Sequence, residues 1–218
     1  MSSPAKLVIW GAGGHARVVA DLVRRQKKYV LAGFIDDAQP GRKGEIFCAA
    51  RILGGRDALA QLRKQGVRKL IVAIGDNSTR LKCAAAAREL GFELATVISP
   101  AADVAAGTKI GAGTVICSGA IVTPGVCLGD NVILNTACSV DHDCQIADGA
   151  HICPGAHLAG NVSVGRAAWI GIGSAVIEGI KISDGALIGA GAAVVRNIPA
   201  NVLAVGVPAR VVRKLTRK

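Results

Sequence analysis

An aliphatic residue returns at every sixth position from Ile98 to Val194, and no insertion breaks this register. Three positions later, thirteen of the seventeen repeats carry Gly or Asn, the residues that adopt a positive φ most readily. An aliphatic residue and a tight corner in each hexad are typical of a parallel β-helix, in which three hexads form one triangular turn. The sequence therefore predicts nearly six turns of eighteen residues, built on Ile98, Val104, Ile110, Ile116, Val122, Leu128, Leu134, Val140, Ile146, Ile152, Leu158, Val164, Ile170, Val176, Ile182, Ile188 and Val194.

The position after each corner is small or β-branched, which suits an inward-facing site of limited volume. Cys138 and Cys144 occupy this position, so we interpret them as core residues and not as nucleophiles. The chain has seven cysteines with no paired spacing, and we expect reduced thiols.

The first ninety-seven residues alternate between apolar runs and amphipathic stretches. We expect strands at 6–10, 29–35, 69–74 and 93–98, and helices at 17–25, 57–65 and 78–90. Strands that alternate with helices predict a small parallel, Rossmann-like α/β sheet of about four strands. The predicted domains are thus an α/β domain at 1–97, a parallel β-helix at 98–198, and a C-terminal segment with a basic tail at 199–218.

A glycine loop, Gly11–Ala16, follows the first predicted strand and precedes a helix. Such a loop offers backbone N–H groups to an anion, so we interpret it as a site for a nucleotide diphosphate. It fits the dinucleotide fingerprint only superficially, because four strands are too few for two mononucleotide halves. The alternative is a glycine turn that serves only tight strand–helix packing.

The net charge of +11 belongs to the two ends of the chain. Residues 1–97 carry +9, residues 98–194 carry −4 and residues 195–218 carry +6. Basic ends can attract phosphates, or can simply be solvated and, in the tail, frayed. Aromatic residues are only 3% of the chain, which argues against a base-stacking nucleic-acid platform.

The stretch from Ile110 to Gly129 holds twenty residues without a charge. Its length could span a bilayer, but it contains five glycines and Pro124, and its apolar residues recur periodically. We therefore predict no membrane span. The start of the chain shows no apolar signal region, and we predict a cytoplasmic protein.

His142 is the histidine best placed for acid–base chemistry. It lies between Asp141 and Asp143, and its stacked neighbours one turn away, Pro124 and Gly160, leave an open shelf. Histidine suits general acid–base catalysis near neutral pH, and a neighbouring carboxylate can orient its ring. Adjacent strand residues point to opposite faces, but this rule relaxes at a corner, so the aspartate that orients His142 stays open.

His151 and His157 occupy the same position in consecutive hexads, which places them on different faces of the prism. We interpret His151 as a cofactor contact. His157 is either a cofactor contact or a corner residue.

The whole chain resembles the sugar acetyltransferases related to sialic-acid O-acetyltransferase, members of the hexapeptide-repeat acyltransferases. The resemblance rests on a small α/β domain before an uninterrupted hexapeptide helix, and on these motifs: Gly11–His15, Asp36-Asp37, Ala73–Asn77, Asn135-Thr136, His142-Asp143, Gly155-Ala156, Ala159–Asn161 and Val205–Ala209. The members that look most similar N-acetylate the amino group of UDP- or GDP-linked 4-amino-4,6-dideoxy sugars, on the pathways to diacetylbacillosamine and N-acetylperosamine.

The resemblance implies a nucleotide-sugar-binding domain at 1–97 and a left-handed β-helix acyltransferase domain at 98–198. It also implies acetyl-CoA as co-substrate, no metal, and a homotrimer with the active site between adjacent subunits. It implies His142 as the catalytic base and Asp143 as its acidic neighbour, where relatives often have Glu. The implied contacts to acetyl-CoA are His151, Gly160, Ile172 and Ala190, the last where relatives can have Gly. The implied contacts to the nucleotide sugar are Gly13, Gly14, His15, Asp36, Asp37 and Gly75.

Three alternatives stay open at this stage. Transfer to a hydroxyl would make the chain an O-acetyltransferase of the sialic-acid type. Three histidines near one groove could bind zinc in a carbonic-anhydrase-like hydrolase, although their spacings do not match that family's metal motif. The repeat alone would also suffice for a non-catalytic binding or scaffold protein.

Overall fold

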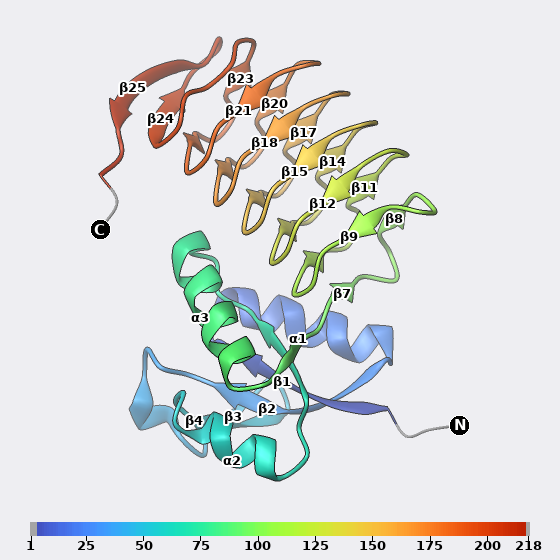
Figure 1. Cartoon of the computed structure of the whole chain (residues 1–218), viewed down its shortest axis with the longest axis vertical. Coiled ribbons are helices and arrows are strands. Elements are labelled where there is room, and N and C mark those ends of the chain that lie inside the picture. Colours follow the sequence, from blue (N-terminus) through green and yellow to red (C-terminus); the bar gives the residue numbers. More distant parts are fainter. Residues whose placement is uncertain (1–3, 217–218) are drawn as a thin grey trace. The chain divides into compact units, whose positions relative to one another are not determined.

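The computed structural model describes residues 4–216 and divides after Pro100 into two compact units, each treated by itself below (Figure 1). Within these residues no helix is both long and apolar enough to cross a membrane.

The first unit is a six-stranded sheet in the order β3-β4-β2-β1-β5-β6 with helices packed against it. β3 pairs antiparallel with β4, and the other pairs are parallel. Its elements are β1 (Ala5–Trp10), α1 (Gly14–Gln26), β2 (Tyr29–Ile35), the 3-10 turn η1 (Pro40–Arg42), β3 (Ile46–Phe47), β4 (Ala50–Gly54), α2 (Ala58–Lys64), β5 (Lys69–Val72), α3 (Asn77–Glu89) and β6 (Glu93–Leu94).

The sheet has two more strands than the sequence predicted, because the hairpin of β3 and β4 was missed. Its turn consists of Cys48 and Ala49, which adopt positive φ values of 45° and 59°. Hairpin turns of this kind normally carry Asn or Gly, so the turn had no sequence signal. The single strand predicted at 93–98 is two strands, β6 and β7 (Val97–Ile98), and only β6 belongs to this sheet.

The second unit is the predicted left-handed parallel β-helix. Strands eighteen residues apart pair in parallel, as Val115 with Ile133 and Ile133 with His151, so each turn holds three hexads. One face carries β10 (Val115–Ile116), β13 (Ile133–Leu134), β16 (His151–Ile152), β19 (Trp169–Ile170) and β22 (Leu187–Ile188). The second carries β8 (Asp103–Val104), β11 (Ile121–Val122), β14 (Ser139–Val140), β17 (His157–Leu158), β20 (Ala175–Val176) and β23 (Ala193–Val194). The third carries β9 (Lys109–Ile110), β12 (Cys127–Leu128), β15 (Gln145–Ile146), β18 (Ser163–Val164) and β21 (Lys181–Ile182).

The repeat residues take the places that the sequence predicted. The fourteen repeat aliphatics from Ile116 to Val194 are buried. Twelve of the thirteen Gly and Asn corners have positive φ, and Asn197 does not. Cys138 and Cys144 are fully buried, and burial raises the pKa of both thiols, that of Cys138 to about 12, which confirms them as core residues.

The C-terminal segment forms a hairpin of β24 (Val202–Val205) and β25 (Arg210–Lys214) that extends the first face. The expectation of a frayed tail is therefore wrong for β25, although its basic side chains are exposed. Arg217 and Lys218 lie outside the described residues.

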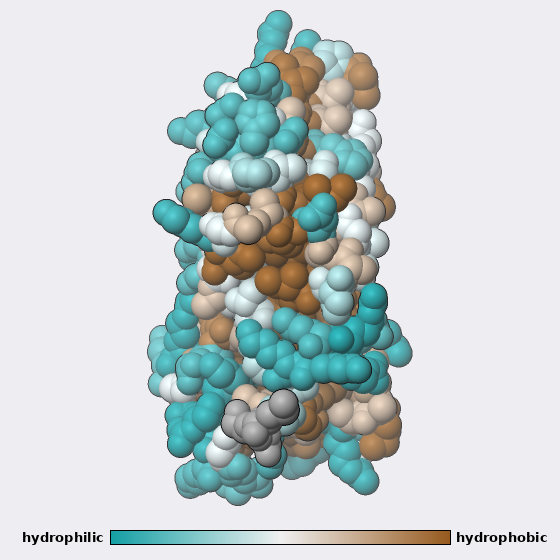
Figure 2. All heavy atoms as spheres, turned by 90° about the vertical axis from the view of Figure 1, so that its right-hand side faces the viewer, coloured by the Kyte–Doolittle hydropathy of each residue, from teal (hydrophilic) through white to brown (hydrophobic). Residues whose placement is uncertain are grey.

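Apolar side chains also gather on the surface, and Figure 2 shows a band of them with hydrophilic side chains around it. The large exposed apolar residues of the β-helix include Ile121, Ile172, Ile177 and Val195. Apolar patches of this kind commonly mark contacts with other molecules.

Candidate active site

His142 lies at the corner between β14 and β15, and Asp143 forms the corner itself with a φ of 60°. This left-handed conformation turns the Asp143 side chain back toward its neighbour. The His142 Nδ1 lies 3.0 Å from Asp143 Oδ2. Because a carboxylate only accepts hydrogen bonds, Nδ1–H donates to it, and the Nε2 lone pair of the neutral ring is left for a proton.

Asp141 has a different task. Its Oδ1 accepts hydrogen bonds from the backbone N–H of His142 at 2.9 Å and from Thr123 Oγ1 at 3.0 Å. The structure thus answers the question that the sequence left open: Asp143 orients the ring, and Asp141 fixes the backbone of the corner.

Two glycines make room for this pair. A Cβ atom on Gly160 would lie 2.5 Å from His142 Nε2 and 3.0 Å from Nδ1, and a Cβ atom on Gly125 would collide with Asp143 Oδ1. Therefore the shelf predicted over Gly160 exists, but the His142 ring itself fills part of it. The contact fixes the height of the ring above the β-helix.

The hydrogen bond to Asp143 raises the pKa of His142 most, burial opposes it, and the charges of Asp141, Asp143 and Glu178 each add a smaller increase. About half of the His142 side chain is exposed to solvent. The arrangement favours the imidazolium that forms when the ring accepts a proton, which is what a general base requires.

The backbone N–H of Gly160 is a candidate donor to a developing oxyanion. Among residues 4–216 no acceptor receives this N–H, whereas the next one along the chain, that of Asn161, donates to the His142 carbonyl at 2.8 Å. A fixed donor beside the base is the geometry that stabilises a tetrahedral oxyanion.

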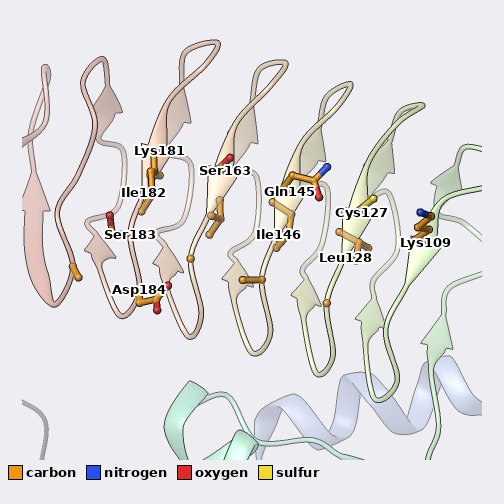
Figure 3. Close-up of a pocket in the computed structure, with 15 residues that line it drawn as sticks. Lys109, Cys127, Leu128, Gln145, Ile146, Ser163, Lys181, Ile182, Ser183 and Asp184 are labelled. Atoms are coloured by element: carbon orange, nitrogen blue, oxygen red, sulfur yellow. The ribbon is translucent and has the colours of Figure 1, made fainter.

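A groove of about 780 Å³ runs along the third face of the β-helix. The strand β15 of this face follows directly after the His142 corner. Figure 3 shows the side chains of five successive strands along it, with Lys109 and Lys181 near its two ends. Between them lie Cys127, Gln145 and Ser163, and the carboxylate of Asp184 also lines the groove, so its middle is neutral and its charged side chains are Lys109, Lys181 and Asp184.

The other expected acetyl-CoA contacts lie elsewhere on the prism. His151 is on the first face, buried, with its Nε2 3.0 Å from Asn135 Nδ2 and its ring 4.4 Å from that of Trp169. Ile172 and Ala190 stack at the corner between the first and second faces, through a 2.8 Å bond from Gly191 N–H to the Ile172 carbonyl. One prism therefore does not bring them to the His142 corner.

His157 is on the second face, as the spacing predicted, so His151 and His157 do lie on different faces. Its Nδ1 lies 2.8 Å from Ser139 Oγ in the preceding turn, and its side chain is exposed. No group of three or more His, Cys, Asp or Glu residues in the described part of the chain could hold a metal ion.

In the first unit the glycine loop lies at a point where the strand order reverses. β2 lies on one side of β1 and β5 on the other, and their carboxyl ends carry the loops at 11–13, 36–39 and 73–76. Ligands of open α/β sheets bind at such a switch point. Gly13 and Gly14 are exposed at the start of α1, and a Cβ atom on Gly14 would meet nothing within 4 Å, so a ligand can approach the backbone there.

Arg42 is a candidate that the sequence analysis missed. Its Nη1 donates to the Ala12 carbonyl of the glycine loop at 3.1 Å and to Asp36 Oδ2 at 3.0 Å. The hydrogen bond to Glu45 raises the pKa of Arg42 most, and the Asp36 charge contributes. Nothing in the sequence indicated that Arg42, thirty residues along the chain, would contact the glycine loop.

The expected contacts Asp36 and Asp37 are both engaged within the unit. Asp36 is buried, and its Oδ1 accepts from the backbone N–H groups of Ala38 and Gln39. Asp37 Oδ2 accepts from Trp10 Nε1 at 3.0 Å. Asp36 therefore fixes the loop after β2 and Arg42 with it.

His15 and Gly75 are linked by a buried arginine. Arg80 is 1% exposed, and its Nη1 donates to the Gly75 carbonyl at 3.0 Å. Burial, and then the Arg80 charge, lower the pKa of His15 to about 4, so His15 is neutral at physiological pH. The loop after β5 is thus fixed beside a neutral imidazole and a buried cation.

One family model and one curated protein match parts of the chain. Residues 6–87 match the family model described as the PglD N-terminal domain. One curated protein, YJL218W of Saccharomyces cerevisiae, is 39% identical over 57 residues, which are 26% of this chain and only 29% of the yeast protein.

Solved structures match nearly the whole chain. Perosamine N-acetyltransferase from Caulobacter crescentus, in complex with CoA and GDP-perosamine, is 39% identical with a TM-score of 0.92, over 96% of this chain and 98% of that one. The acetyltransferase domain of PglB from Neisseria gonorrhoeae is 36% identical with a TM-score of 0.89, over 95% and 99% of the two chains. WeeI from Acinetobacter baumannii is 27% identical with a TM-score of 0.85, over 95% and 100%.

Proposed function

We propose, from the premise that this chain belongs to the CoA-dependent N-acetyltransferases of nucleotide-linked amino sugars, that it acetylates the 4-amino group of a nucleotide-linked 4-amino-4,6-dideoxy sugar. The observation that carries the proposal is the His142–Asp143 pair held over Gly160. GDP-perosamine is the first substrate to test, because the Caulobacter relative was solved with it. Formation of N-acetylated sugar nucleotide from acetyl-CoA, identified by mass, tests the proposal.

His142 acts first as base in this mechanism. Its Nε2 accepts a proton from the amine while the amine nitrogen bonds to the thioester carbonyl carbon. The Gly160 N–H donates to the oxyanion that forms at the carbonyl oxygen. When the carbon–sulfur bond breaks, the imidazolium returns its proton to the departing thiolate, and His142 is neutral again. No cysteine carries the acetyl group, which agrees with the buried thiols at Cys138 and Cys144.

Acetyl-CoA would lie along the β-helix. The neutral groove beside the His142 corner fits a long uncharged pantetheine arm, and Lys109 and Lys181 offer cations for phosphates. Exposed Ile172 and Ala190 would add apolar contacts, but they occupy another corner of the prism.

We therefore include a homotrimer in the proposal, with each active site between two subunits. A neighbouring prism would bring its Ile172 corner to the His142 corner of the first, which one chain cannot do alone. The exposed apolar band in Figure 2 supports this packing, because such a surface is stabilised when a partner covers it. The predicted cytoplasmic location also stays part of the proposal.

The nucleotide would bind in the first unit at the switch point. We propose that the backbone at Gly13 and Gly14 faces the diphosphate, with Arg42 as an additional cation. His15 and Gly75 would line the opposite loop. Asp36 acts indirectly, by holding Arg42.

Replacing Arg42 with alanine is expected to raise KM for the sugar nucleotide about tenfold or more, the scale of one charge-assisted hydrogen bond, with kcat nearly unchanged. Asp36→Ala is expected to raise the same KM, because Arg42 loses its anchor. Steady-state kinetics measure both effects, with the exposed Arg88→Ala as the control. An unchanged KM in both variants would remove this pocket from the proposal.

The Asp143→Asn variant is expected to move the acid limb of the pH–rate profile to lower pH. Asp143 raises the pKa of His142, so removal of its charge lowers that pKa, and the neutral base persists in more acidic solution. The plateau rate is expected to fall about tenfold, because a weaker base accepts the proton less well. Asn suits the left-handed corner, so the backbone is retained.

The pH dependence of kcat/KM, measured between about pH 5 and pH 9 so that it covers the ordinary range of histidine pKa values, would show this shift. Asp103→Asn is the control, since Asp103 is exposed on β8. An acid limb that stays in place in Asp143→Asn would mean that Asp143 does not set the basicity of His142.

A further inference from the structure

The His142 corner belongs to a column of residues, one from each turn, at positions 124, 142, 160, 178 and 196. Backbone hydrogen bonds connect the turns: Asp143 N–H to the Pro124 carbonyl, Asn161 N–H to the His142 carbonyl, and Gly179 N–H to the Gly160 carbonyl at 3.0 Å. Successive turns of paired strands lie about 4.8 Å apart. Glu178 is therefore two turns from His142, and only Gly160, which has no side chain, lies between them.

The His142 ring turns one edge toward that gap. The Cβ position of Gly160 lies 2.5 Å from Nε2 and 3.0 Å from Nδ1, the nitrogen that is bound to Asp143. The nitrogen that takes the proton is thus closer to the Gly160 turn than Nδ1 is. Glu178 stands one turn beyond Gly160, on this side of the ring.

Glu178 is exposed and has no hydrogen bond or ion pair within residues 4–216, so no such bond holds its carboxylate elsewhere. Its charge is one of those that raise the pKa of His142, after the hydrogen bond to Asp143 and together with the charges of Asp141 and Asp143. The remaining charged residue of the column is Arg196, at the position one turn further on.

We propose that Glu178 is a positioning residue for the acyl transfer: across the gap at Gly160 it stabilises the imidazolium of His142 during the step in which the ring holds the amine proton. This role rests on the proposed function. Asp143 orients the ring from the Nδ1 side, and Glu178 acts through space on the Nε2 side. The Glu178 carboxylate gains and loses no proton and forms no bond.

The direct test is the titration of His142 in the free protein. NMR of the ring Cε1–H, assigned by its absence in His142→Ala, follows the protonation of this one histidine. Glu178→Gln is expected to lower the pKa of His142, and the exposed Glu89→Gln is the matched control. High salt is expected to lower the pKa in the parent protein more than in Glu178→Gln, since salt screens exposed charges. An unchanged titration in Glu178→Gln would overturn the proposal.

The pH–rate profile then tests the role in the reaction. With Glu178→Gln the acid limb is expected at lower pH, so the variant is faster than the parent in acid and about two- to threefold slower on the plateau. Glu178→Asp is expected to retain part of the parent behaviour. A titration that moves while the rate profile stays in place would also overturn the role. The NMR titration needs no turnover, so it remains decisive even if no sugar amine is acetylated.

Discussion

Replacing His142 with alanine is expected to lower kcat by at least about a hundredfold, the usual effect of losing a general base. The amine then has no imidazole to accept its proton: Asp143 stands behind the Nδ1 side of the missing ring, and Asp141 is bound to the corner backbone. Folding is expected to be intact, since about half of this side chain is exposed. KM for both substrates should change little, because the ring accepts the amine proton and other residues bind the two substrates.

Initial rates of thiol release would measure the effect, with circular dichroism and size-exclusion chromatography as folding checks. His157→Ala is the matched control: this histidine is also exposed on the β-helix, but it bonds to Ser139 on the second face. A loss below tenfold in His142→Ala would remove His142 as the base.

The second large effect is expected from a single methyl group at Gly160. In Gly160→Ala the new Cβ atom would lie 2.5 Å from His142 Nε2, so the ring must leave its position. A displaced base costs up to about a hundredfold in kcat, because reacting groups misplaced by about 1 Å lose their alignment. The obstructing atoms belong to a half-exposed side chain that can move, so the expected cost in stability is only about 1 kcal/mol, from the lost hydrogen bond to Asp143.

A double-mutant cycle isolates the contact. In the His142→Ala background the space above Gly160 is free, so the added methyl group is expected to cost almost no stability there. Chemical denaturation of the four variants measures the coupling. An equal cost in both backgrounds would mean that the methyl group strains the backbone of the turn, and that the ring does not rest on Gly160.

Much of the β-helix could be predicted from the sequence because each hexad repeats the same local pattern, an aliphatic residue followed three positions later by a corner residue. The aliphatic at Ile152 and the corner at Gly155 need no information from distant residues, and the turn of eighteen residues follows from them. The open shelf next to His142 could also be predicted, since Pro124 and Gly160, which lack bulky side chains, stand one turn away in a register without insertions.

The other features of the site and the fold depend on backbone conformations and tertiary contacts that the sequence pattern does not indicate. Asp143 reaches the ring of its own neighbour only because its φ is positive, which residue type alone does not indicate. The hairpin turn at Cys48 and Ala49 has the same cause. Arg42 reaches the glycine loop through a tertiary contact with Asp36, and no pattern of spacing encodes such a contact.

The most direct test of the central claim is acetyl transfer itself. The purified protein would be incubated with acetyl-CoA and, in turn, GDP- and UDP-linked 4-amino-4,6-dideoxy sugars, with thiol release and product mass followed together. The account predicts one free thiol for each sugar nucleotide that gains one acetyl group, on the 4-amino group, with one of the two nucleotides. No thiol release across the panel from folded protein, or equal acetylation of sugars that carry a hydroxyl in place of the amine, would contradict it.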